Sequence, residues 1–223
     1  MRNKKIAIVH TTPVTVDSLK ALIDETVPNS EIVNFVDDSI LPELIQNGGD
    51  VNRVENRLIQ YYKFAEQVGA NIVLNACSSV GEVVAEGQKQ VGVPIVRIDE
   101  PMAENAIKSG RKIGVIATLE TTLKPTITLL NSKSAELNRE VEIFSKVAGE
   151  AYQRLIAGDK DDHDQIIAEA LTKMGEEADV VVLAQASMAR VVSTLPKELQ
   201  NKFLSSPESG VERVKETLEG TAK

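Results

Sequence analysis

Cys77 is the only cysteine among 223 residues, and it follows a segment, residues 70–76, that is typical of a buried strand. A tight turn comes next, and a helix is predicted from Glu82 to about Gln90. Ligands of open parallel sheets bind at the carboxyl ends of the strands. Backbone N–H groups and the positive end of a helix dipole would favour a thiolate there. We therefore expect a partly exposed Cys77 with a lowered pKa, the alternative being a small buried hydrophobic residue.

Small hydroxyl residues follow the ends of the other predicted strands. They are Thr11, Thr12, Ser78, Ser79, Thr118, Thr121, Thr122 and Ser187. Ordinary helix capping explains any one of them taken alone. Hydroxyls and free N–H groups at helix N-termini also bind carboxylates and similar anions. Four such strand ends around a thiol favour a site for a small anion.

Other kinds of chemistry have little support in the sequence. No G-x-G-x-x-G segment or P-loop follows a predicted strand, and no Cys/His group has the spacing of metal ligands. We expect Asp99, Glu100 and Glu104 to cap helices or lie on the surface. Arg97 could meet a substrate carboxylate, although a structural ion pair is the expected role. The sequence thus predicts neither a nucleotide site nor a metal site.

The chain also matches itself. Residues 5–12 align without gaps on residues 112–119, an offset of 107, and residues 70–80 align on residues 178–188, an offset of 108. Buried parallel strands all resemble one another, so a single match would carry no weight. Two matches in the same order at nearly the same offset indicate a duplicated α/β half of about 110 residues.

Strand and helix patterns alternate along the sequence, which is typical of βαβ units and parallel sheets. We predict strands at 5–10, 31–35, 71–75, 94–97, 112–117, 141–145, 179–184 and about 202–205. We predict helices at 14–27, 51–68, 81–90, 100–109, 122–133, 149–157, 162–177, 187–193 and 208–220. The expected fold is α/β, with two pseudo-symmetric doubly wound lobes that each hold a mainly parallel four-stranded sheet. The first lobe should comprise residues 1–98 plus 206–223, and the second residues 99–205.

Composition narrows the possible partners. Hydrophobic residues make up 42% of the chain, enough for full cores. Aromatic residues are 3%, Trp is absent and the net charge is −8, which argues against nucleic acid or an anionic membrane as partner. An expected strand from Lys5 leaves no room for a signal peptide, and no apolar run approaches the ~20 residues of a membrane span. We predict a cytoplasmic protein, and the sequence leaves homo-oligomer formation open.

Residues 75–79 and 182–189 resemble the two signature turns of the aspartate/glutamate/hydantoin racemase superfamily. Residues 113–118 and 205–211 are similar to further segments of it, so the resemblance covers nearly the whole chain. It implies two doubly wound lobes with the active site between them and no cofactor. It also implies two cysteines, one per lobe, that flank the α-carbon of the substrate. One thiolate removes the proton, and the other thiol returns a proton from the opposite face.

This chain departs from the superfamily pattern in the second turn. Gln185 stands where the second cysteine is expected, followed by Ala186 and Ser187. Gln does not exchange protons at neutral pH, and a Ser hydroxyl without a base is a poor acid. Two-thiol racemisation is therefore unsupported. The superfamily also includes a decarboxylase with one cysteine, in the opposite lobe, and isomerases in which one cysteine attacks covalently.

His10 ends the first predicted strand, about where glutamate racemases carry an acidic residue that assists the first thiol. An imidazole there could accept the Cys77 proton or act as a second acid/base, the alternative being a hydrogen-bonded structural His. His163 lies in a charged helix start, and we expect it to be solvated and without a role.

We predict a cofactor-independent, racemase- or epimerase-like isomerase that acts next to the carboxylate of a small acid or amino acid. The expected catalytic residues are Cys77 and His10. The expected substrate-binding residues are Thr11, Thr12, Ser78, Ser79, Thr118, Thr121, Gln185, Ala186 and Ser187. A decarboxylase, a cis–trans isomerase and a non-catalytic small-acid-binding protein are the alternatives.

Overall fold

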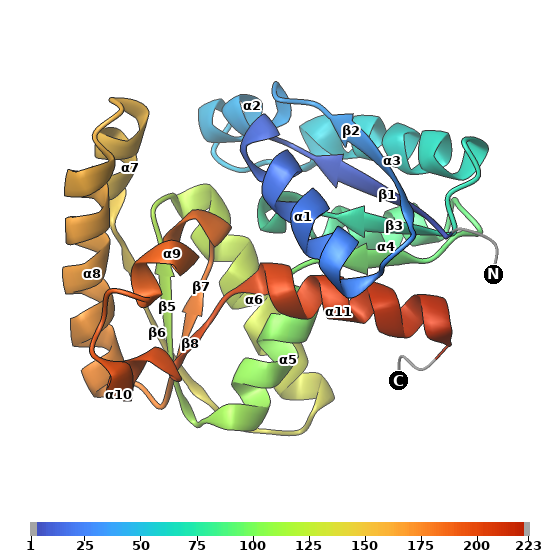
Figure 1. Ribbon diagram of the computed structural model, residues 1–223. Helices are drawn as coiled ribbons and strands as arrows, with labels where there is room; N and C mark the ends of the chain where they lie inside the picture. The colour runs from blue at the N-terminus through green and yellow to red at the C-terminus, as the bar shows by residue number, and fades with distance from the viewer. Residues whose placement is uncertain (1–3, 221–223) are drawn as a thin grey trace. The chain divides into compact units, whose positions relative to one another are not determined.

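A computed structural model describes residues 4–220 of the chain and shows two compact units. One unit holds Met1–Asp99 and Pro207–Lys223, and the other holds Glu100–Ser206. Each contains one four-stranded sheet, and every strand pair in both sheets is parallel (Figure 1). The prediction of an α/β fold with two four-stranded parallel sheets is confirmed.

The first sheet has the order β2-β1-β3-β4. Its strands are β1 (Lys5–His10), β2 (Glu31–Val36), β3 (Ile72–Asn75) and β4 (Ile95–Arg97). The helices of this unit are α1 (Val16–Thr26), α2 (Ile40–Gln46), α3 (Asn52–Gln67), α4 (Val83–Gln88) and α11 (Ser206–Glu219). Ala7 and Val9 face a core formed with α2, α3 and α4, whereas Ile6 and Ile8 face a core formed with α1 and α11. This alternation along β1 is the two-residue period of a strand.

The second sheet has the equivalent order β6-β5-β7-β8. Its strands are β5 (Lys112–Ala117), β6 (Glu142–Val147), β7 (Val180–Leu183) and β8 (Phe203–Leu204). Its helices are α5 (Glu100–Ser109), α6 (Glu120–Glu136), α7 (Gly149–Ile156), α8 (Lys160–Glu177), α9 (Ala189–Val192) and α10 (Lys197–Gln200). One face packs against α5 and α6, and the other against α7, α8 and α9. The two units therefore repeat one topology, as the internal match predicts.

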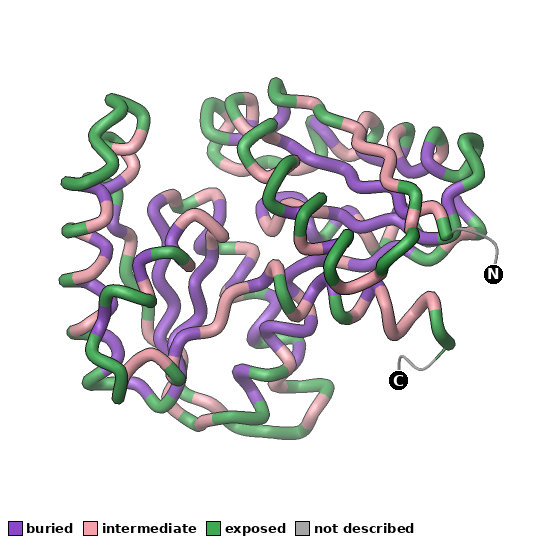
Figure 2. Tube along the Cα trace, in the orientation of Figure 1, coloured by how far each residue is buried: buried purple, intermediate pink, exposed green. Residues whose placement is uncertain are grey.

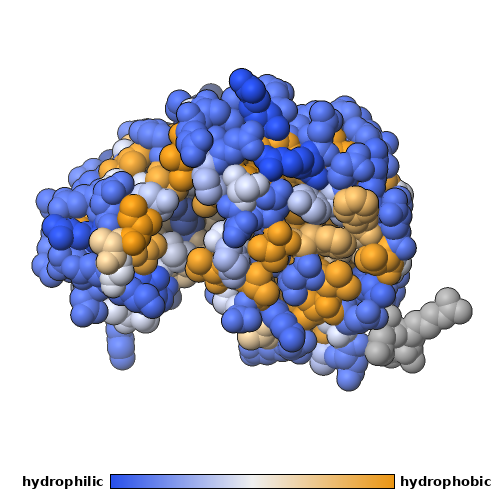
Figure 3. Space-filling model, turned by 90° about the horizontal axis from the view of Figure 1, so that it is seen from above, coloured by the Kyte–Doolittle hydropathy of each residue, from blue (hydrophilic) through white to orange (hydrophobic). Residues whose placement is uncertain are grey.

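Burial follows this layered arrangement. The strands β3 and β7 are buried along their whole length, and in Figure 2 the helices alternate between buried and exposed residues. The surface in Figure 3 is mostly hydrophilic, with hydrophobic residues in scattered groups. No helix among residues 4–220 combines the length and the apolar character that crossing a bilayer requires.

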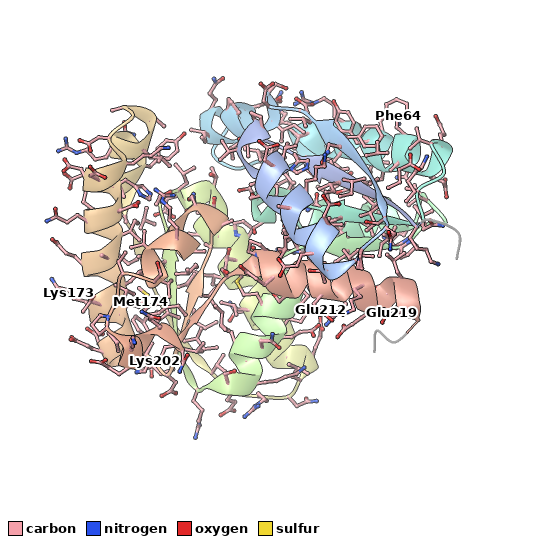
Figure 4. All side chains as sticks on the ribbon, in the orientation of Figure 1. Phe64, Lys173, Met174, Lys202, Glu212 and Glu219 are labelled. Carbon is pink, nitrogen blue, oxygen red and sulfur yellow. The ribbon has the colours of Figure 1, made fainter. Side chains whose placement is uncertain are left out.

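A lysine side chain caps the C-terminal end of α8. Figure 4 shows Lys202 beside the C-terminal part of this helix, where its Nζ donates to the carbonyl oxygens of Gly175 at 2.7 Å and Ala178 at 2.9 Å. A cation suits this position because the last carbonyl groups of a helix lack partners and carry partial negative charge.

Some helical segments differ from the prediction. The helices α2 and α10 were not predicted, and they are only seven and four residues long. Pro42 argues against a helix in the sequence, because proline lacks a backbone N–H. It is, however, the third residue of α2, where a backbone N–H has no intrahelical acceptor. The predicted helix at 81–90 is shorter: a 3₁₀ turn at Ser78–Val80 precedes α4.

The last helix, α11, packs against the first sheet. Val211 and Val214 are fully buried in the same core as Ile6 and Ile8. Gly210 allows the close approach, because a Cβ there would lie 2.6 Å from the carbonyl oxygen of Ile98. A larger residue at this position would push α11 away from the end of β4.

Candidate active site

Strand register brings Thr11 beside Cys77. Val9 of β1 pairs with Asn75 of β3, and two residues further on each chain are Thr11 and Cys77. Both therefore continue on the sheet face that packs against α2, α3 and α4. The Thr11 hydroxyl is buried and forms no well-aligned hydrogen bond with a described residue, but it lies close enough to the sulfur to favour the thiolate.

Cys77 is partly exposed and lies in extended conformation just before the 3₁₀ turn. Dense surrounding protein nevertheless desolvates its sulfur, and this desolvation is the largest effect on its pKa and raises it. The hydroxyls of Thr11 and Ser79 and the backbone N–H groups of Ser79 and Val80 act in the opposite direction. The expectation of a lowered pKa is therefore wrong, because desolvation of the sulfur outweighs the hydroxyls and N–H groups that favour the thiolate.

The raised pKa of Cys77 predicts how its alkylation depends on pH. A thiol with a raised pKa is protonated at neutral pH, so iodoacetamide should react slowly there. The rate should climb only at pH above the ordinary thiol value of about 8.5. The measurement is the alkylation rate of native protein against pH, with urea-unfolded protein as control. A native thiol that ionises below the unfolded one would contradict the prediction.

An ion pair flanks the Cys77 turn. Arg97 donates to the fully buried Asp99 through Nε at 2.6 Å and Nη2 at 3.0 Å. The guanidinium also lies against Gly81, the residue that ends the turn. The expected structural ion pair of Arg97 is thus present, and it supports the turn that carries the thiol.

His10 lies on the other face of the sheet, with Ile6 and Ile8. Its Nε2 donates to Asn34 Oδ1 at 2.9 Å, and its Nδ1 then accepts from the Thr15 hydroxyl at 2.9 Å. Burial lowers the pKa of this imidazole, opposed in part by the Asn34 hydrogen bond. The ring is therefore neutral at neutral pH, and both of its nitrogen atoms have partners other than Cys77.

The remaining residues of the first unit that we expected to bind substrate differ in burial and in hydrogen bonding. Thr12 accepts from the Val14 N–H at 3.4 Å and so caps the short 3₁₀ segment Pro13–Thr15. Ser79 is buried in the turn, and Ser78 is half-buried. Among these residues the structure thus brings Thr11, Ser79 and Cys77 into contact.

The second unit repeats this register with different chemistry. Ile116 pairs with Leu183, and two residues further on are Thr118 and Gln185, the counterparts of Thr11 and Cys77. Gln185 Oε1 accepts from the Thr118 N–H at 2.6 Å, and Gln185 Nε2 donates to the Thr118 hydroxyl at 2.8 Å. The amide therefore occupies the position of a second thiol and is held by its neighbour.

A side chain of α9 is hydrogen-bonded to the turn that follows Gln185. Ala186–Met188 form a 3₁₀ turn, and the Ser187 carbonyl accepts from Arg190 Nη1 at 2.7 Å. Arg190 also pairs with Asp164 at 2.6 Å. Elsewhere in this unit, the Thr121 hydroxyl near the start of α6 is buried and has no hydrogen-bond partner among residues 4–220.

His163 differs from expectation. It is fully buried, with Nδ1 2.6 Å from Asp164 Oδ1, and it is not solvated. Asp159, four residues earlier, is the residue that caps α8. A residue three positions inside an amphipathic helix can face the core, which the charged neighbours of His163 obscured in the sequence.

Within the part of the chain that the structure describes, no group of three or more His, Cys, Asp or Glu side chains is placed to hold a metal ion. The polar residues at the strand ends offer hydroxyls, amides and one thiol.

The model of the Asp/Glu/Hydantoin racemase family matches residues 6–214. The chain belongs to this family. No curated protein matches the sequence. Among solved structures, a glutamate racemase from Bacillus anthracis is 20% identical with a TM-score of 0.74, covering 100% of this chain and 85% of that chain.

Two further solved structures share the fold. An aspartate racemase homologue from Pyrococcus horikoshii is 20% identical with a TM-score of 0.72, covering 97% of this chain and 99% of that one. An allantoin racemase from Klebsiella pneumoniae is 15% identical with a TM-score of 0.66, covering 99% and 90%. The resemblance drawn from the two turns is confirmed. This racemase-family chain keeps a cysteine in its first turn and has Gln185 in its second.

Proposed function

We propose that the protein is a cofactor-independent isomerase of the racemase or epimerase type that moves a proton at the carbon next to a carboxylate. Its substrate would be a small acid or an amino acid. The observation that carries this proposal is the surroundings of Cys77: two hydroxyls and two backbone N–H groups favour its thiolate, in a chain of a racemase family.

In this proposal the substrate-binding groups are residues at the ends of strands. Thr11, Thr12, Ser78 and Ser79 act from the first unit, and Thr118, Thr121, Gln185, Ala186 and Ser187 act from the second. Their hydroxyls and N–H groups bind the carboxylate and stabilise the negative charge that develops on it when the α-proton leaves. The thiolate form of Cys77, a minor fraction at neutral pH, takes that proton. Return of a proton from the thiol to the same face restores the substrate, whereas a proton from water on the opposite face inverts the carbon.

The second turn has no proton donor of this kind. Gln185 is an amide held by Thr118, so it binds substrate and exchanges no proton. His10 is neutral and bound to Thr15 and Asn34, so in this proposal it orients the end of β1. One-base chemistry therefore exchanges the α-hydrogen with solvent faster than it inverts the carbon.

The raised pKa of Cys77 favours a second candidate at the same site, a decarboxylation. When a carboxyl group departs as CO₂, the electron pair of the broken C–C bond remains on the α-carbon. A protonated thiol can donate its proton to that carbanion from one face. This reaction needs a single proton donor.

Incubation in deuterated water tests the proposal. Amino acids and 2-hydroxy acids are followed by NMR for loss of the Cα–H signal and by chiral chromatography for the opposite enantiomer. We expect deuterium to enter faster than the enantiomer appears. Release of CO₂ from 2-substituted malonates, without exchange, would replace the proposal by the decarboxylase. Calorimetric binding with neither reaction would leave a small-acid-binding protein.

Replacements of Gln185 separate binding from proton transfer. Gln185→Ala leaves the Thr118 N–H and hydroxyl without their partner, so KM should rise about tenfold while kcat changes less than about threefold. Gln185→Cys supplies a thiol in the second turn, where the family pattern has its second cysteine, and should raise the rate of racemisation, measured by chiral chromatography. Gln165→Ala, on the exposed side of α8, is the control. A kcat loss in Gln185→Ala with unchanged KM would contradict a binding role.

A further inference from the structure

We propose that Tyr62 and Asn75 are positioning residues that hold the Cys77 turn in the geometry needed for proton transfer. The proposal rests on the proposed function of Cys77 and adds two residues to it that carry no chemistry themselves. Tyr62 lies in the middle of α3, and Asn75 is the last residue of β3.

A continuous hydrogen-bond chain joins these residues to the turn. The Tyr62 hydroxyl donates to Asn75 Oδ1 at 3.0 Å, and Asn75 Nδ2 donates to the carbonyl oxygen of Cys77 at 3.1 Å. Both side chains are fully buried. A buried amide must satisfy its donor and acceptor separately, so the Tyr62 donor fixes which way the Asn75 amide points.

The Cys77 carbonyl links this chain to the sulfur. The same oxygen accepts from the Val80 N–H at 3.3 Å, which closes the 3₁₀ turn. The closed turn directs the N–H groups of Ser79 and Val80 toward the sulfur, where they favour the thiolate. A displaced carbonyl would open the turn and move those N–H groups away.

Packing keeps Tyr62 at this place. Its ring lies so close to Gly87 of α4 that a Cβ there would be 2.5 Å from Tyr62 Cδ2. Burial raises the pKa of Tyr62 above its ordinary value, and the nearby Cys77 raises it further. Tyr62 therefore contacts the helix after the turn as well as the strand before it.

The second unit shows that the fold itself does not need these polar groups. Leu183 pairs with Ile116 as Asn75 pairs with Val9, and Leu183 is packed in an apolar core. The residue 108 positions after Tyr62 is Ala170, in that same core. The buried Tyr–Asn pair thus occurs beside the thiol, while its counterpart beside Gln185 is apolar.

The test is the pH dependence of Cys77 alkylation, which is unambiguous because the chain has no other cysteine. Tyr62→Phe removes the hydroxyl and little volume. It should shift the alkylation midpoint upward by about half a pH unit or more, and lower kcat about tenfold with KM within about twofold. Tyr61→Phe is the matched control, since the Tyr61 hydroxyl donates to Asp37 instead. This control should leave the midpoint unchanged.

A double variant separates positioning from stability. Tyr62→Phe with Asn75→Leu removes both polar partners and copies the apolar residue of the second unit, so it should recover much of the stability lost in Tyr62→Phe. Its alkylation midpoint should stay shifted. An unshifted midpoint in Tyr62→Phe, or a midpoint that recovers together with stability, would overturn the proposal. Alkylation needs no substrate. If the wild-type protein shows no turnover, the proposed function is rejected, but the alkylation midpoints still test the role of Tyr62 and Asn75.

Discussion

Cys77→Ala should abolish exchange of the substrate α-hydrogen. Cys77 is the one thiol of the chain, and the observed partners of His10 and Gln185 leave neither side chain free to replace it. Loss of a positioned acid/base lowers rates by about 10²–10⁴-fold, and we expect kcat to fall by at least about a hundredfold. Deuterium incorporation at Cα, followed by NMR, measures the loss.

The matched control is Cys77→Ser, which keeps the size of the side chain and removes its acidity. It should bind substrate normally and be nearly as inactive as Cys77→Ala. Both variants should unfold at urea concentrations close to wild type, because the thiol is partly exposed. Racemisation that proceeds equally in both directions without Cys77 would show the one-base assignment to be wrong.

Arg97→Met should cause the largest loss of stability among single changes near the site. It leaves the carboxylate of Asp99 fully buried without its bidentate partner. Removal of one member of a buried ion pair lowers the free energy of unfolding by about 3–5 kcal/mol, because the remaining charge is uncompensated. Urea denaturation followed by circular dichroism measures this change.

Lys89→Met provides the comparison. Lys89 pairs with Glu86 at 2.7 Å on the surface, where solvent screens the charges, so its loss should change stability little. Adding Asp99→Leu to Arg97→Met should restore part of the lost stability, since no buried charge then remains. Equal urea midpoints for Arg97→Met and Lys89→Met would refute the structural role of the Arg97–Asp99 pair.

The strand pattern and the internal match were enough to predict the two sheets. The buried strand β7 is apolar throughout, and β3 is apolar up to its last residue, Asn75. The offsets of 107 and 108 correspond to equivalent strands in the same sheet order. The short helix α2 could not be predicted in this way, because its Pro42 resembles a helix breaker until the first turn is located.

The sequence predicts a candidate site at the strand ends, but it carries less information about the chemistry of the residues there. Alternation along β1 already places Thr11 and His10 on opposite faces of the sheet, and this signal is present in the sequence. The raised pKa of Cys77 depends on how densely other segments surround the sulfur, and local sequence does not report that density. Tyr62 was missed because its contact with Asn75 joins a helix to a strand, and a tyrosine on an amphipathic helix resembles any other core residue.

The position of α11 sets the order in which the protein can fold on the ribosome. All residues of the second unit, 100–206, are synthesised before Val211 and Val214. Chains emerge from the N-terminus at about 5–20 residues per second. The first sheet thus waits for α11, and during that interval its face around Ile6 and Ile8 lacks the cover of this helix. The unit that carries Cys77 is consequently completed only after the whole second unit has been synthesised.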